Sequence, residues 1–176
     1  DKKGEKDKRT RSVIVIYKNK IIAEKYDTNF NKNSRILGWS MTKSITATYF
    51  GILEKQGKFD INKPAPIAEW QKDERAIITT KNLLHMNSGL EWEEKYDKIC
   101  DATKMLFQAE DMGQVQLEKP AKFPPNLHWN YSSGTTNLLS KILRNQFKTH
   151  QEYLDFWYTS LIDKIGMNSM IVESDM

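Results

Sequence analysis

The sequence is poor in cysteine and histidine, and this scarcity argues against several kinds of site. Its 176 residues include one cysteine, Cys100, so no disulfide can form within the chain. A lone cysteine is more often a packing residue than a catalytic one. The three histidines are His85, His128 and His150, and none has the close histidine pairing that is typical of a zinc site. We therefore expect no metal and no cofactor.

Long apolar runs and basic stripes are also missing. No stretch is long and apolar enough to span a membrane as a helix. The net charge is +4, and much of it comes from residues 1–11, a mixed-charge segment that indicates a solvated arm. Because no basic stripe is interleaved with aromatic residues, nucleic-acid binding is not expected. With 39% apolar and 11% aromatic residues, the composition is that of a globular protein.

The most informative pattern is a serine followed three residues later by a lysine, Ser40 and Lys43. Apolar residues recur at helical spacing after Lys43, and Gly57 is a natural left-handed stop, so the pattern predicts a helix from Ser40 to about Gln56. Side chains three apart share a helix face, so the lysine amine can reach the serine hydroxyl. A serine becomes a nucleophile when a base takes its proton, and lysine can be that base.

Taken alone, this pair has a simpler explanation. Serine and lysine at this spacing occur by chance in many proteins, as a serine that caps a helix and a lysine that points into solvent. The rest of the sequence must decide between the two interpretations.

The order of elements predicts an α+β fold. Residues 12–26 form a β-branched hairpin that is apolar on both faces, which predicts strands buried on both sides. We assign residues 1–11 to the arm, 12–34 to the first strands of a sheet, and 35–176 to a helical domain. A hairpin alone is not stable, so we expect further strands that this chain does not supply.

Several helices are expected in the helical part. The sequence predicts short helices at residues 82–86, stopped by Ser88 and Gly89, and at residues 101–108. A longer helix follows residues 131–134. The last helix begins at a capping box of Thr149 and Glu152 and ends near Gly166, and residues 119–126, which hold three of the five prolines, form a loop.

Four segments resemble one known family. They are residues 38–44 (GWSMTKS), 57–64 (GKFDINKP), 78–90 (ITTKNLLHMNSGL) and 129–134 (WNYSSG). In this order they resemble the serine β-lactamase and penicillin-binding-protein superfamily. The similarity is to its class C-like branch of esterases and amidases, which includes hydrolases of the 6-aminohexanoate-dimer type and family VIII esterases. The resemblance implies a β-lactamase-like fold, of which this chain carries the N-terminal portion.

The resemblance also implies roles for five residues. Ser40 would attack an acyl carbon and form an acyl-enzyme, and Lys43 would accept its proton or hold Tyr131 in a state that can. Which of the two is the general base stays open, because they would titrate as a unit. Ser133 would contact the substrate. His85 would be structural, and the alternative for Tyr131 is an aromatic residue packed at a loop–helix junction.

Two departures from the family pattern bear on the substrate. The second motif ends in Ser133 where many members have asparagine, which puts β-lactam hydrolysis in doubt and favours the esterase and amidase branch. The third family motif, a lysine- or histidine-x-glycine strand that also supplies an oxyanion donor, is not found after Tyr131. We expect a C-terminal segment of the same protein to complete the fold and the site.

The sequence thus predicts a serine hydrolase that acts on a small ester, amide or peptide-like substrate. A penicillin-binding or sensing module with little turnover, and a cell-wall D-alanine carboxypeptidase, share the same motifs and remain alternatives. The family resemblance further implies export to the periplasm or the exterior.

Overall fold

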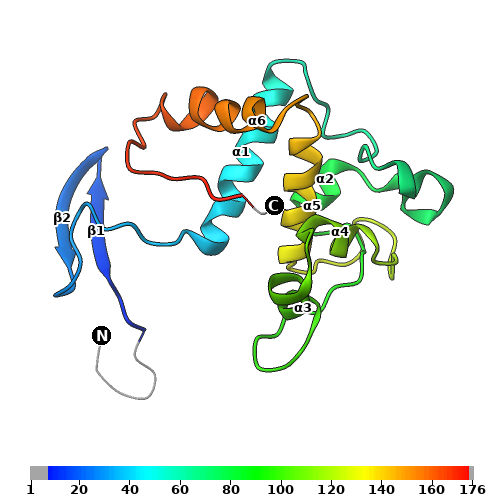
Figure 1. Cartoon of the computed structure of the whole chain (residues 1–176), viewed down its shortest axis with the longest axis horizontal. Helices are drawn as coiled ribbons and strands as arrows, with labels where there is room; N and C mark the ends of the chain where they lie inside the picture. The colour runs from blue at the N-terminus through cyan, green and yellow to red at the C-terminus, as the bar shows by residue number, and fades with distance from the viewer. Residues whose placement is uncertain (1–7, 175–176) are drawn as a thin grey trace. The chain divides into compact units, whose positions relative to one another are not determined.

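The computed structural model describes residues 8–174, and these divide into two units, one ending at Leu37 and the other beginning at Gly38. Each unit is described by itself. The first contains strands β1 (Ser12–Tyr17) and β2 (Lys20–Tyr26). The second contains α1 (Thr42–Lys55), α2 (Thr80–Leu84), α3 (Asp101–Gln108), α4 (Met112–Leu117), α5 (Ser133–Arg144) and α6 (His150–Trp157). Figure 1 shows their order along the chain.

The first unit is the predicted hairpin. β1 and β2 pair antiparallel, from Ser12 opposite Tyr26 to Tyr17 opposite Lys20, with an irregularity between Val15 and Ile16. The two turn residues, Lys18 and Asn19, have φ of 45° and 60°. Positive φ at both positions matches the twist of the strands, which is why two-residue hairpins favour such turns.

The prediction that the hairpin is buried on both faces is wrong for the described residues. Val15, the least exposed of the five apolar β1 residues from Val13 to Tyr17, is 44% exposed, and Ile22 on β2 is 61% exposed. The sheet has two strands among the described residues. A two-stranded ribbon has no other element to cover its faces, so the apolar side chains on both faces stay exposed to solvent.

The start of α1 differs by two residues from the prediction. Ser40 lies in a short 3-10 helix, Trp39–Met41, and α1 begins at Thr42 with Met41 as its N-cap. No side chain caps either helix start, so Ser40 is not the N-cap serine of the simpler interpretation. The end is as predicted: Gly57 has φ of 68°, and the amides of Gly57 and Lys58 bond to the carbonyls of Glu54 and Leu53. This is a Schellman cap.

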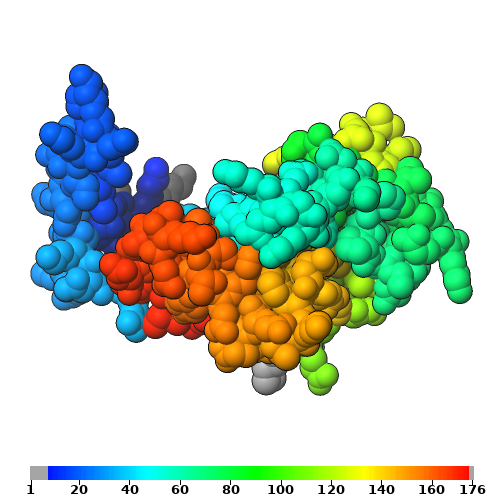
Figure 2. All heavy atoms as spheres, turned by 90° about the horizontal axis from the view of Figure 1, so that it is seen from above, coloured from blue at the N-terminus to red at the C-terminus, as the bar shows by residue number. Residues whose placement is uncertain are grey.

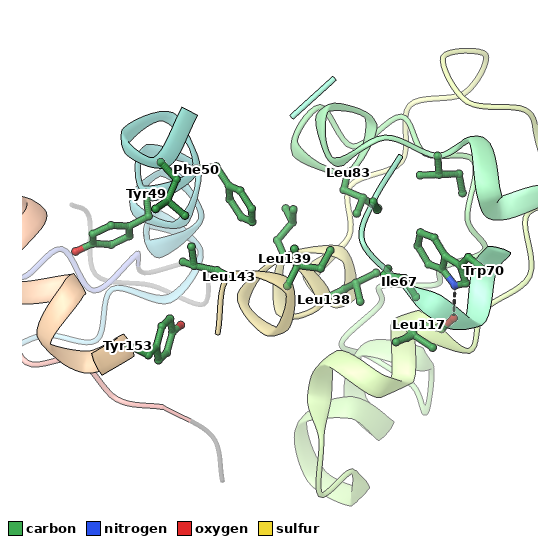
Figure 3. Packing of buried hydrophobic residues seen from close by; sticks show 14 of the residues in the cluster. Tyr49, Phe50, Ile67, Trp70, Leu83, Leu117, Leu138, Leu139, Leu143 and Tyr153 are labelled. Atoms are coloured by element: carbon green, nitrogen blue, oxygen red, sulfur yellow. Dashed lines mark hydrogen bonds between the residues drawn. The ribbon is translucent and has the colours of Figure 1, made fainter. Parts of the chain in front are cut away.

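The core of the second unit forms around α5. Its buried stripe is Leu138, Leu139, Ile142 and Leu143. Figure 3 shows these leucines facing Phe50 and Tyr49 of α1 on one side and the Trp70 segment on the other. Leucines at this spacing give α5 one apolar face, and burial of such a face is the main source of stability for a helix of this length.

Helix α6 closes the other side of α1. The ring centroids of Tyr49 and Trp157 are 4.3 Å apart, and the Tyr49 hydroxyl donates to the Trp157 carbonyl at 2.7 Å. Burial, followed by the charges of Tyr153 and Tyr158, raises the pKa of Tyr49, so its phenol remains a donor. In Figures 1 and 2 the orange α6 lies against the cyan α1. The predicted capping box is present: Thr149 and Glu152 exchange hydrogen bonds at the start of α6.

Beyond α6 the chain continues as a π-helix, Tyr158–Ile162, and turns at Gly166, which has φ of 70°. The end near Gly166 is therefore confirmed. Helix α3 has the predicted bounds, and residues 119–126 form the predicted loop. Helix α4 was not predicted, because six residues that include Gly113 carry no apolar stripe long enough to recognise.

The stop of α2 lies earlier than predicted. The helix ends at Leu84, and the left-handed residue is Met86, with φ of 57°, rather than Ser88 or Gly89. The amides of Met86 and Asn87 bond to the carbonyls of Leu83 and Asn82, so a Schellman cap forms without glycine. The sequence predicts the stop at glycine, because few other residues adopt positive φ readily.

Gly89 has a different role. It has φ of 81°, and a Cβ there would lie 1.9 Å from the carbonyl oxygen of Phe123. Its own carbonyl accepts from the amides of Lys122 and Phe123. Gly89 thus allows the segment after α2 to run close along the 120–123 loop, whose continuation leads to Tyr131.

Candidate active site

Ser40 is presented at the surface by a strained turn. Trp39, directly before it, has φ of 44°, a conformation that a bulky residue rarely adopts, and its side chain is 72% exposed. Gly38 precedes the turn, and a Cβ at Gly38 would approach Thr42 Oγ1 to 3.0 Å. The turn leaves Ser40 exposed just ahead of α1.

Lys43 joins three of the residues that the sequence singled out. Its Nζ lies 2.9 Å from Ser40 Oγ and 3.2 Å from Ser133 Oγ. The same Nζ lies 4.9 Å from the centroid of the Tyr131 ring. Ser133 is ninety residues further along the chain, so this meeting depends on tertiary structure. Lysine has three donor positions and can serve two hydroxyls at once.

Tyr131 meets Lys43 with the face of its ring. Among the described residues, no hydrogen bond joins its hydroxyl to Ser40 or Lys43, so the contact is of the cation–π kind. The segment before Tyr131 is fixed by Asn130, whose amide donates to the Met86 carbonyl and whose side chain donates to the Trp92 carbonyl. Met86 lies in the segment 78–90 that resembles the family, so that segment helps to position Tyr131.

The start of α5 fixes Ser133. The N-cap is Ser132, whose Oγ accepts from the amide of Thr135 and donates to Oε1 of the buried Gln116. A Cβ at Gly134 would lie 2.5 Å from both Gln116 and the Trp92 ring. Trp92 and Gln116 thus pack directly on the helix backbone next to Ser133, and only glycine leaves them room.

Three residues around Ser133, namely Trp92, Glu94 and Tyr96, were not predicted from the sequence. The carboxylate of Glu94 accepts from the Ser133 amide and hydroxyl, both at 2.7 Å, from Trp92 Nε1 at 2.8 Å and from the Tyr96 hydroxyl at 2.7 Å. Trp92, Glu94 and Tyr96 follow shortly after the segment 78–90 that resembles the family. The sequence signal available for them was an aromatic residue two positions before a carboxylate, a pattern too common to indicate a site.

The pKa values of Glu94 and Tyr96 follow from this cluster. Burial alone would raise the pKa of Glu94, but the hydrogen bonds from Ser133, Tyr96 and Trp92 together bring it below its ordinary value. Burial and then the hydrogen bond to Glu94 raise the pKa of Tyr96. Near neutral pH, Glu94 is therefore an anion that only accepts, and Tyr96 is a donor.

Ser40, Lys43 and Ser133 line a common cleft. Its volume is about 1120 Å³, and Tyr96, Met105 and the exposed side of α5 also line it. Small-molecule sites typically have about 300–1,000 Å³, so a small substrate can be accommodated next to the serine. Tyr131 is not among the lining residues.

Other predicted features lie away from this cleft. Cys100 is buried, with 4% exposure, at the start of α3, and its thiol donates to the Lys95 carbonyl. In the part of the chain that the structure describes, no group of three or more His, Cys, Asp or Glu residues is placed to hold a metal ion. None of the described helices has the length and apolar character needed to cross a membrane.

Comparisons with known proteins place the fold. The family model described as Beta-lactamase matches residues 3–175. One similar solved structure is described as "Putative 6-aminohexanoate-dimer hydrolase from Bacillus anthracis", with a TM-score of 0.65, 20% identity, and coverage of 79% of this chain and 40% of that one. Another is described as "putative beta-lactamase from Bacteroides dorei", with a TM-score of 0.70, 14% identity, and coverage of 89% and 46%.

The chain therefore spans less than half the length of these two structures, and the likeness to them shows the fold alone. No curated protein sequence matches significantly. The predicted α+β, β-lactamase-like fold is confirmed by the family match and by the described arrangement of a two-stranded sheet and helices.

Proposed function

The chain belongs to the beta-lactamase family, and from that premise we propose that it is a serine hydrolase that forms an acyl-enzyme on a small ester or amide. The observation that carries the proposal is the 2.9 Å contact between Lys43 Nζ and Ser40 Oγ at the edge of a cleft. A nucleophile within hydrogen-bond reach of a base is the geometry that activated serines require.

The proposed reaction has two halves. Ser40 Oγ attacks the carbonyl carbon while its proton passes to Lys43 Nζ, and the bond to the leaving alcohol or amine breaks as that group receives the proton. Water then adds to the acyl-enzyme, gives up a proton by the same route and releases Ser40. Tyr131, with its ring against Nζ, is proposed to assist the proton transfer.

Two features of Ser133 favour a small ester or amide over a β-lactam. Ser133 stands where many family members have an asparagine, and its hydroxyl is shorter than an amide and offers fewer hydrogen bonds. The Ser133 hydroxyl also donates its hydrogen bond to the Glu94 carboxylate at 2.7 Å, so it can only accept a hydrogen bond from a substrate. By family resemblance we further propose that the protein is exported.

Steady-state assays with four substrates test the proposal. The protein is incubated with a chromogenic ester, an anilide, a chromogenic cephalosporin and a peptide that ends in D-alanine. We expect steady turnover of the ester or the anilide and little of the cephalosporin. A stoichiometric burst that then stops would favour the sensing module, and release of D-alanine from a peptide would favour the carboxypeptidase. No burst and no turnover with any substrate would refute the proposal.

A further inference from the structure

The carboxylate of Glu94 is surrounded by hydrogen-bond donors. It receives four hydrogen bonds of 2.7 to 2.8 Å, two of them from Ser133. These donors come from its own loop and from the first turn of α5. The neighbouring Glu93, in contrast, points to Lys98 and Lys95, and its side chain is 44% exposed. Glu93 thus pairs with exposed lysines, whereas the adjacent Glu94 binds the start of α5.

The contacts of Glu94 determine what the Ser133 hydroxyl can do. A serine hydroxyl has one proton and two lone pairs. The proton is directed to Glu94, so the oxygen has only accepting capacity left for Lys43, whose Nζ lies at 3.2 Å. Hydrogen bonds in this row can run in one direction only: from Lys43 to Ser133, and from Ser133 to Glu94.

We propose that Glu94 is a positioning residue that sets the orientation of the Lys43 amine through Ser133. The inference rests on the proposed function, in which Lys43 is the base for Ser40. In the structure Nζ donates to both hydroxyls. When Lys43 acts as the base it is instead a neutral amine, which has two N–H bonds and one lone pair. Because one N–H must point to Ser133, the lone pair is free to face the hydroxyl of Ser40 at 2.9 Å, which is the orientation that proton transfer needs.

The surroundings of Glu94 support this role. Its titratable neighbours are Tyr96, which donates to it, Tyr131, which lies close enough to act electrostatically on Tyr96, and Lys43, which is linked to it by Ser133. Ser133 and Glu94 are both partly buried, so their hydrogen bonds are shielded from competing water. The Glu94 carboxylate, which accepts four short hydrogen bonds, thus holds the Ser133 hydroxyl in a fixed orientation.

Kinetics of matched variants test the proposal. Glu94→Gln keeps the size of the side chain, but its amide group confronts donors where a carboxylate oxygen accepted. We expect kcat for ester hydrolysis to fall roughly 10-fold or more with little change in KM. Glu93→Gln, the control, should stay within about twofold. In a Ser133→Ala background, Glu94→Gln should have less than about a third of its effect, because the linking hydroxyl is gone.

A second measurement separates positioning from a purely structural role and does not need turnover. The ¹⁵N resonance of Lys43 Nζ is compared at one fixed pH in the wild type, Glu94→Gln, Glu93→Gln and Ser133→Ala. Because Glu94 acts on the amine through the Ser133 hydroxyl, Glu94→Gln should move this resonance in the same direction as Ser133→Ala does. The Glu93→Gln resonance should match the wild type.

An unchanged Lys43 resonance and equal kcat in wild type and Glu94→Gln would overturn the proposal while leaving Ser40 and Lys43 in place. If the wild-type protein shows no covalent chemistry at Ser40, the proposed function fails, yet the Lys43 resonance still decides whether Glu94 acts on the lysine.

Discussion

The Nζ atom of Lys43 lies 2.9 Å from the Oγ atom of Ser40, although a break in helix type separates the two residues. Ser40 belongs to the 3-10 helix and Lys43 to the first turn of α1. The spacing of three still brings the two side chains to one face. The same amine contacts Ser133 at the start of α5, so two helix starts converge on the proposed base.

Lys43 and Tyr131 are predicted to act as one unit. Lys43→Ala and Tyr131→Ala should each reduce kcat for ester hydrolysis by roughly 10²-fold or more, since the first removes the proposed base and the second removes the ring that lies against its Nζ. The double variant should be little worse than the worse single variant. Steady-state kinetics on the four proteins check this. If the two losses multiply, the residues do not share a proton path.

Two glycine substitutions should have opposite effects on stability. Gly134→Ala brings a Cβ within 2.5 Å of Gln116 and Trp92, so it should lower the free energy of unfolding by about 1–3 kcal/mol. Gly51→Ala in α1, where a Cβ meets nothing within 4 Å, should raise it by about 0.5–1 kcal/mol. Urea denaturation of both variants tests the pair. A neutral Gly134→Ala would show that Trp92 and Gln116 can move away from α5.

The stability of the second unit should depend on the charge of Asp111 in acid. Burial opposes its ionisation, but the bond from Lys141 and the Gln114 amide lower the pKa of Asp111 below the ordinary aspartate value. Because the folded pKa is below the unfolded one, the stabilisation is complete above the unfolded value, near pH 4. It is lost as the pH falls through the folded pKa.

Asp111→Asn keeps an N-cap acceptor for α4 and removes this charge. It should therefore lower Tm at pH 7, and the difference from wild type should shrink below about pH 4. Thermal unfolding at several pH values measures this. The exposed Asp97→Asn serves as the control and should follow the wild type throughout. A constant difference at every pH would mean that only the geometry of the cap matters.

The sequence was most informative where one local rule decides the structure. The caps at Gly57 and at Thr149 with Glu152, the bounds of α3 and the hairpin turn were all recoverable, because each depends on neighbours along the chain. The left-handed Met86 was not, since methionine does not favour positive φ, and one of its hydrogen bonds, from the Asn130 amide, comes from a distant segment.

The candidate site shows the same division. Ser40 and Lys43 could be paired from their spacing, and Tyr131 and Ser133 could be proposed from a family motif. Glu94 could not, because its importance comes from four donors that gather around it only in the folded chain. The burial of the hairpin was misjudged for a related reason: apolar residues on both faces predict burial only if something is there to cover them.

The most direct test of the central claim is intact-mass spectrometry after treatment with a fluorophosphonate. The wild-type protein should gain one adduct, mapped to Ser40 by peptide analysis, and Ser40→Ala should gain none while keeping its Tm, because Ser40 is exposed and caps no helix. Ser44→Ala, an exposed serine one position after Lys43, should label like the wild type. An adduct that persists in Ser40→Ala, or that maps to another residue, would contradict the assignment of Ser40 as the nucleophile.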